Sequence, residues 1–79
     1  MWEMNNKTSK VSPRESQVLH LIAYEHSTQE IADALFVSFD TALTHRKNLL
    51  KKLKVKNTAG LVRVAFEEGF LHLPSVQTI

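Results

Sequence analysis

Residues 38–53 read SFDTALTHRKNLLKKL, and this stretch predicts one long amphipathic helix. At about 100° per residue, its apolar seam and its polar, cationic face lie on opposite sides. The seam consists of Ala42, Leu49 and Leu53, with Arg46 at its margin. The opposite face consists of Thr44, Lys47 and Lys51, flanked by Asp40, Leu43 and Asn48. Such a helix can lie on a core and present its outer face to a DNA major groove, or it can be an ordinary surface helix with a solvated cationic face.

Two capping boxes predict the helices that precede this stretch. Ser12, followed by Pro13 and Glu15, starts a helix over about 13–24, because serine suits the N-cap, proline the first turn and glutamate the return bond. Ser27 and Glu30 open a shorter helix in the same way. Its inward-facing residues are Ile31, Ala32 and Leu35. About three residues then connect it to the long helix, whose N-cap is expected at Ser38. Two helices joined in this way form the helix-turn-helix arrangement.

A last helix is predicted over about 58–68, with Asn57 as its N-cap and Gly69 as the residue that ends it. Its apolar arc is unusually wide. One face, made of Val62, Ala65 and Phe66, is enough to join a core. Leu61 and Val64 lie to one side of that face, as second-tier core or as a surface that pairs with a second copy. Such wide apolar coverage on a terminal helix favours the dimer surface.

These elements predict an all-α fold with four helices in one domain over residues 11–71. Residues 1–10 are expected to form a flexible arm or the remnant of a linker, and residues 72–79 a tail. The chain has no cysteine, which fits a reducing cytoplasm and leaves no disulfide or thiolate metal site. It has no apolar run of the roughly 18–20 residues that cross a bilayer and no signal-peptide core. We therefore expect a cytoplasmic protein without a membrane partner.

The distribution of charge is more informative than the formal net charge of +2. No acidic residue occurs between Asp40 and Glu67. The cations in that interval are Arg46, Lys47, Lys51, Lys52, Lys54, Lys56 and Arg63. Such a local basic field indicates a polyanionic partner, although Lys54 and Lys56 are equally well explained as solvated loop charges.

A catalytic site is hard to build from the remaining residues. Gly60 and Gly69 cannot form a phosphate-binding loop. The four histidines lack the spacing of metal ligands, and the adjacent Glu67 and Glu68 point in different directions. His45, at the edge of the seam, is better explained as a packed, hydrogen-bonded histidine than as a reader of bases. We expect neither an enzyme nor a cofactor.

Three motifs in a fixed order resemble a known family. They are VSPRESQVLHLIA at 11–23, STQEIADALFVS at 27–38 and TALTHRKNLLKKLKV at 41–55, and a closing helix follows them. Together they resemble the LuxR-type (GerE-like) helix-turn-helix domain over residues 11–71. The resemblance implies a bacterial transcriptional regulator that binds double-stranded DNA and forms a homodimer through its last helix. In this family the domain usually follows a receiver or a small-molecule-binding domain.

The resemblance also implies roles for particular residues. The recognition helix corresponds to residues 39–53, and its base-facing positions are Leu43, Thr44 and Lys47. Phosphate contacts are implied at Thr28, Gln29, Ser38, Thr41, Arg46 and Lys51. The dimer interface is expected at Leu61, Val64 and Glu68.

Three residues depart from the family pattern. Ala42 replaces the usual valine, and Leu43 replaces the usual lysine in the middle of the reading face. Glu25 replaces the usual glycine at the end of the first helix. It must therefore adopt the left-handed conformation that glycine takes freely, unless the helix continues to His26.

Two other interpretations remain open. A sigma-factor region-four-like domain would contact promoter DNA and RNA polymerase, although the KL-V-KN connection at residues 52–57 and the capped last helix favour the LuxR type. A protein-interaction module that has lost DNA binding is best supported by Leu43.

Overall fold

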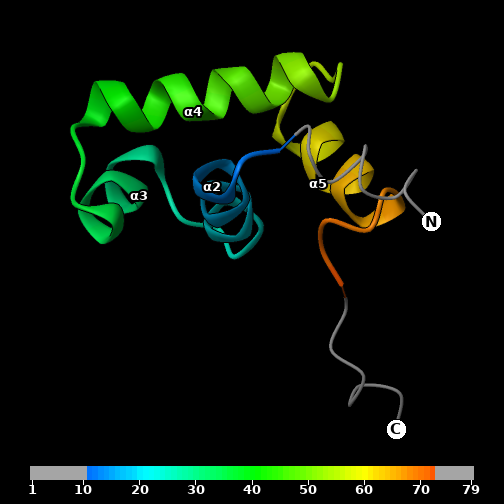
Figure 1. Cartoon of the computed structure of the whole chain (residues 1–79), viewed down its shortest axis with the longest axis horizontal. Coiled ribbons are helices and arrows are strands. Elements are labelled where there is room, and N and C mark those ends of the chain that lie inside the picture. The colour runs from blue at the N-terminus through cyan, green and yellow to red at the C-terminus, as the bar shows by residue number, and fades with distance from the viewer. Residues whose placement is uncertain (1–10, 73–79) are drawn as a thin grey trace, which may run out of the picture.

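The computed structural model describes residues 11–72, which form four α-helices and no strand (Figure 1). The helices are α2 (Pro13–Ala23), α3 (Thr28–Leu35), α4 (Phe39–Lys52) and α5 (Thr58–Glu67). In Figure 1, α4 lies across the top of the molecule, with α3 below its N-terminal end and α5 near its C-terminal end. It packs against each of the other three helices. The predicted all-α, four-helix fold is confirmed. The predicted arm, and the tail beyond His72, fall outside the described residues.

All four helices contribute to one hydrophobic core. Its centre consists of the fully buried Val18, Leu19, Ile31, Leu49 and Leu61, drawn from every helix. Burial of such side chains stabilises the fold by about 1.5–3 kcal/mol each. The small Ala32, Ala42 and Ala65 are also about 1% exposed or less. Small side chains at these positions let the helix axes approach closely. One of them, Ala42, replaces the valine that is usual in the family, and it is fully buried.

Each helix begins with a side chain that caps an orphan backbone amide. Ser12, Ser27, Ser38 and Asn57 are extended residues, and each accepts a hydrogen bond from the amide three positions on. Both predicted capping boxes are present. Glu15 Oε1 accepts from the Ser12 amide at 3.1 Å, and Glu30 Oε1 accepts from the Ser27 amide at 2.8 Å. The four predicted helix starts are therefore confirmed, because every one depends on residues only three apart.

Each helix ends with a Schellman motif, in which one residue turns into the left-handed conformation. These residues are Glu25, Phe36, Lys54 and Gly69, with φ of 70°, 58°, 57° and 87°. At the end of α2, the amide of Glu25 donates to the carbonyl of Ile22 at 2.9 Å, and the amide of His26 donates to that of Leu21 at 3.0 Å. The left-handed conformation predicted for Glu25 is confirmed. Only one of the four positions carries glycine, which alone adopts this conformation without a steric penalty.

The prediction for the last helix is wrong in two respects. Leu61, expected at a dimer interface, is 0% exposed and packs in the core of its own chain. Phe66, expected in the core, is 38% exposed. The core face of α5 is the stripe of Leu61 and Ala65, four residues apart, with Val62 packed beside it. A buried side chain cannot contact a second copy, so Leu61 is removed from the expected interface.

Candidate nucleic-acid interface

The outer face of α4 is open to solvent. Thr44, Lys47 and Lys51 are exposed, and Leu43 beside them is half-buried. Neither lysine has a hydrogen bond or an ion pair within residues 11–72. Ala42 and Leu49 on the opposite side are at most 1% exposed. The helix therefore presents two unpaired cations and a hydroxyl on the side away from the core, which is the division a major-groove helix requires.

Two polar contacts tie the inner flanks of α4 to other helices. Lys52 Nζ donates to Glu15 Oε1 at 2.7 Å, which joins the C-terminal end of α4 to the first turn of α2. Arg46 Nη2 donates to Thr58 Oγ1, which joins the middle of α4 to the first residue of α5. Together with the buried seam, these contacts fix the rotation of α4 about its axis. That rotation decides which side chains point outward.

Glu15 is a buried charge with a complete set of partners. Its side chain is 7% exposed, against 41% for Lys52. Burial by itself raises the pKa of Glu15. The hydrogen bond from Lys52, the bond from the Ser12 amide and the positive charge of Lys52 outweigh that effect, so the pKa is lowered from its ordinary value of 4.5. The carboxylate is therefore charged near neutral pH and holds Lys52 on the inner side of α4.

Sequence reasoning missed both of these contacts. It assigned Glu15 to a capping box alone and counted Lys52 in the basic field. The two residues are 37 positions apart, so no local pattern connects them. One signal in the sequence was available. A capping box accepts glutamine as well as glutamate, so the charge of Glu15 could have indicated a cationic partner.

The expected phosphate-contacting residues lie at the starts of α3 and α4 and along the flank of α4. Ser38 Oγ accepts from the Thr41 amide at 3.0 Å and donates to Thr41 Oγ1 at 3.0 Å. The hydrogen of Ser38 is thus engaged, whereas the hydrogen of the exposed Thr41 hydroxyl remains available to an outside acceptor. Arg46 is half-buried and shares one nitrogen with Thr58, which leaves its other donors for a phosphate.

The two expected phosphate contacts on α3 lie in its first turn. Thr28 is half-buried, and Gln29 is exposed. Gln29 Nε2 donates to Asp33 Oδ1 at 3.0 Å, which occupies one of its amide hydrogens. The free amides at a helix N-terminus and the positive end of its dipole favour a phosphate at this position.

The basic field continues past the C-terminal end of α4. Lys54, Lys56 and Arg63 line a shallow hollow at the start of α5, together with Val55, Asn57 and Gly60. Arg63 is paired with Glu67 at 3.0 Å, so part of its charge is neutralised. Lys54 and Lys56 are exposed and have no partner within residues 11–72. They extend the positive surface beyond α4.

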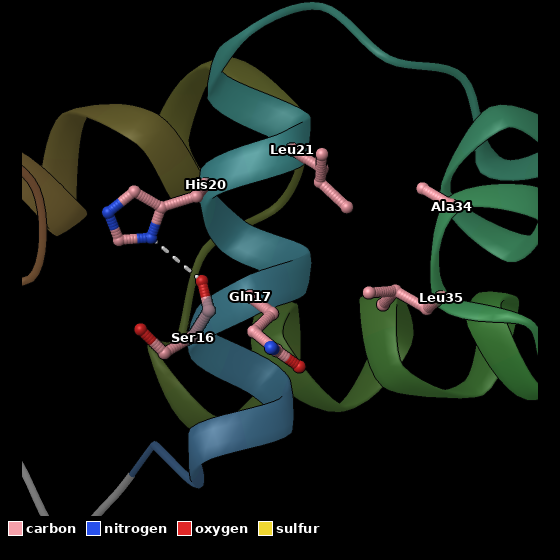
Figure 2. A pocket seen from close by; sticks show the side chains of 6 residues that line it. All are labelled: Ser16, Gln17, His20, Leu21, Ala34 and Leu35. Carbon is pink, nitrogen blue, oxygen red and sulfur yellow. Dashed lines mark hydrogen bonds between the residues drawn. The ribbon is translucent and has the colours of Figure 1, made fainter.

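Figure 2 shows an apolar groove between α2 and α3, lined by Leu21, Ala34 and Leu35 among others. The His20 ring at its edge turns away from these three side chains, and its Nδ1 bonds the Ser16 carbonyl at 2.9 Å. No group of three potential metal-binding side chains occurs among residues 11–72. His45 is half-buried, but it makes no hydrogen bond within residues 11–72, so the prediction of a hydrogen-bonded histidine is wrong. None of the described helices is long and apolar enough to span a bilayer.

The sequence also matches known proteins over most of its length. The sequence profile of a family described as "Bacterial regulatory proteins, luxR family" matches residues 9–65. Over 61 residues, the chain is 48% identical to the transcriptional regulatory protein MctR of Rhizobium johnstonii. It is 39% identical to the uncharacterized response regulatory protein YgeK of Escherichia coli, and 38% identical to the response regulator protein VraR of Staphylococcus aureus. Each match covers 77% of this chain but only 28%, 42% and 29% of the respective relative.

Proposed function

Because the chain belongs to the luxR family of bacterial regulatory proteins, we propose that it recognises specific double-stranded DNA sequences by inserting α4 into the major groove. The observation that carries this proposal is the outer face of α4, where Lys47 and Lys51 are exposed and unpaired within residues 11–72. The inner side of the same helix is anchored by the core and by the contacts of Lys52 and Arg46. The family consists of transcription regulators, not enzymes.

The two lysines are assigned different tasks. Lys47, Thr44 and Leu43 face base edges, where lysine pairs with the guanine O6 and N7 acceptors and an apolar side chain packs on a thymine methyl group. Lys51 lies one turn beyond Lys47, and we assign it to a backbone phosphate. Thr28, Gln29, Ser38, Thr41 and Arg46 complete the proposed phosphate contacts. Affinity then comes mainly from neutralised phosphates and specificity from a few base contacts.

We further propose that two copies pair through α5 on DNA. Val64 is half-buried and is not among the described apolar side chains that pack on the core. Glu68 lies one turn further along the same side of α5. A two-fold contact is self-complementary, so Val64 would meet its own copy. With Leu61 inside the core, this surface is small, and we expect the free protein to be largely monomeric until DNA holds two copies together.

The three relatives are longer than the region that they share with this chain. The match covers less than half the length of each of these three relatives, so a contact with RNA polymerase and a cytoplasmic location are parts of the proposal. The match over residues 9–65 favours the LuxR type over a sigma-factor domain. A protein-interaction module that has lost DNA binding remains the second candidate, because Leu43 stands on the reading face.

The division of roles is tested with Lys47→Ala and Lys51→Ala on a duplex selected from a random pool and on unrelated duplex DNA. Lys47→Ala should cost about 1–3 kcal/mol on the selected duplex and relax discrimination at one base pair. Lys51→Ala should weaken binding to both duplexes alike and reduce the salt slope by about one unit. Arg14→Ala removes the same charge from an exposed position on α2, outside the basic field, and should leave both properties nearly unchanged. Identical behaviour of the first two variants on the two duplexes would disprove the assignment.

A further inference from the structure

A carboxylate lies on the outer face of α4, which is the face proposed to contact bases. Asp40 is exposed in the first turn of α4. Thr44 and Lys47 follow it by four and seven residues, so the three side chains lie in one row along the outer side of the helix. The Asp40 carboxylate has no hydrogen bond or ion pair within residues 11–72. Its two oxygens are therefore available to an outside donor.

Helix stability explains only part of this placement. An acidic residue in the first turn interacts favourably with the positive end of the helix dipole. An acidic residue at the adjacent position 41 would lie in the same turn and interact with the dipole equally well. It would also lie further from the centre of the outer face, so the dipole alone does not require a carboxylate at residue 40. A carboxylate on the outer row instead meets the strong negative potential of DNA, which is unfavourable unless a donor on the DNA compensates.

The major groove offers such donors on only two bases. A carboxylate is purely an acceptor. Guanine presents two acceptors to the groove, thymine presents an acceptor and a methyl group, and adenine presents an N6 amino group next to the N7 acceptor. Cytosine presents its N4 amino group without an adjacent acceptor of its own. A carboxylate at the start of α4 therefore fits cytosine best.

We propose that Asp40 is a specificity-determining residue, which accepts a hydrogen bond from the N4 amino group of a cytosine. This inference rests on the proposed insertion of α4 into the major groove. The row of Asp40, Thr44 and Lys47 then has a hydrogen-bond acceptor at its N-terminal end and a cation at its C-terminal end.

The distance between Asp40 and Lys47 on the helix predicts the distance between the two bases that they contact. Asp40 and Lys47 are seven residues apart, which corresponds to about 10.5 Å along an α-helix and, for a helix inclined in the major groove, to roughly two or three base-pair steps. The cytosine that Asp40 reads and the guanine that Lys47 reads should therefore lie roughly two or three base pairs apart in each half-site. Leu43 lies between them along the helix, at the edge of the row.

The test is selection from a randomised duplex pool with the unmodified chain, Asp40→Ala and Asp40→Asn. The unmodified chain should select cytosine at one position roughly two or three base pairs from a guanine. Asp40→Ala should lose on the order of tenfold discrimination at that position alone, while its affinity for unrelated DNA rises because a negative charge is removed. Asp40→Asn should change the preference there to adenine, because an amide side chain bonds N6 and N7 together.

Glu25→Gln is the matched control, because it removes an exposed carboxylate that is not on α4. It should select the same bases as the unmodified chain. Thermal unfolding of each variant separates helix stability from reading, since the dipole role of Asp40 alone would lower stability without changing any base preference. An unchanged preference at every position in Asp40→Ala would overturn the inference and leave DNA binding intact. If the unmodified chain selects no sequence at all, sequence-specific DNA binding itself fails.

Discussion

Replacing Glu25 by glycine should stabilise this domain, although glycine makes the unfolded chain more flexible. Glu25 ends α2 with φ of 70°, a conformation in which the β-carbon of an L-residue approaches the following carbonyl oxygen. The two backbone hydrogen bonds that close the helix, from the amides of Glu25 and His26, do not involve the side chain. That side chain is exposed, so its removal costs no buried contact. Gly69 holds the same position at the end of α5 without strain.

The expected gain follows from three contributions. Relief of the left-handed conformation contributes about 1–2 kcal/mol, and the larger backbone entropy of unfolded glycine takes back about 0.4–1 kcal/mol. Removing a carboxylate near the negative end of the α2 dipole adds a few tenths of a kcal/mol, because an exposed charge is well screened. The net free energy of unfolding should rise by about 1 kcal/mol, equivalent to roughly 4–8 °C in Tm for a domain of this size.

Urea denaturation at neutral pH, followed by circular dichroism, measures this difference, and two controls separate its parts. Glu25→Ala removes the carboxylate but keeps the β-carbon, so it should gain only the small electrostatic part. Lys54→Gly relieves the same backbone conformation at the end of α4, where φ is 57°, but it removes a cation that favours a helix C-terminus. Its gain should be smaller than that of Glu25→Gly. A Glu25→Gly variant that is less stable than the unmodified chain would refute the reasoning.

Acid should destabilise the fold, because the pKa of Glu15 is lower in the folded chain than its ordinary value. The charged Glu15 carboxylate therefore stabilises the folded state above about pH 5, and this contribution is lost as the pH falls through the folded-state pKa. Glu15→Gln should flatten that part of the pH–stability curve, and a slope equal to that of the unmodified chain would argue against a role for this carboxylate. Val64→Glu should abolish cooperative binding to paired half-sites and leave single half-sites unaffected in a gel-shift titration, whereas Phe66→Glu, on the other side of α5, should preserve the cooperativity. Equal cooperativity in both would exclude the Val64 surface. Leu43→Lys should raise affinity for unrelated DNA and weaken a thymine preference in the selected sequences, and an unchanged preference would mean that Leu43 does not face a base.

The features that the sequence predicted correctly are those set by neighbouring residues. The four N-caps depend on a side chain and an amide three positions apart, so Ser12, Ser27, Ser38 and Asn57 are all where the pattern places them. The left-handed residue that ends α2 was predicted because the family has glycine where this chain has Glu25. The seam of α4 was also correct, because a 14-residue helix fixes its buried side well.

The features that the sequence could not predict depend on how separate helices meet. The short α5 is apolar over most of its circumference, so periodicity alone could not decide whether Leu61 or Phe66 enters the core. The contact of Glu15 with Lys52 joins residues on different helices, as does that of Arg46 with Thr58. At the candidate interface, sequence reasoning found the cations of α4. The structure added that the hydrogen of Ser38 is already engaged and that Asp40, which the sequence had placed beside this face, is exposed and unpaired within residues 11–72.

The most direct test of DNA binding is a salt titration of the unmodified chain on a selected duplex and on unrelated duplex DNA. Each neutralised phosphate contributes about −0.9 to the slope of log K against log salt concentration, so two to four cations per copy should give a slope of roughly −2 to −4 on either duplex. Specific base contacts should appear as a higher affinity for the selected duplex at every salt concentration. Weak binding to both duplexes with a slope near zero would contradict a DNA-binding role and would favour a protein-interaction module.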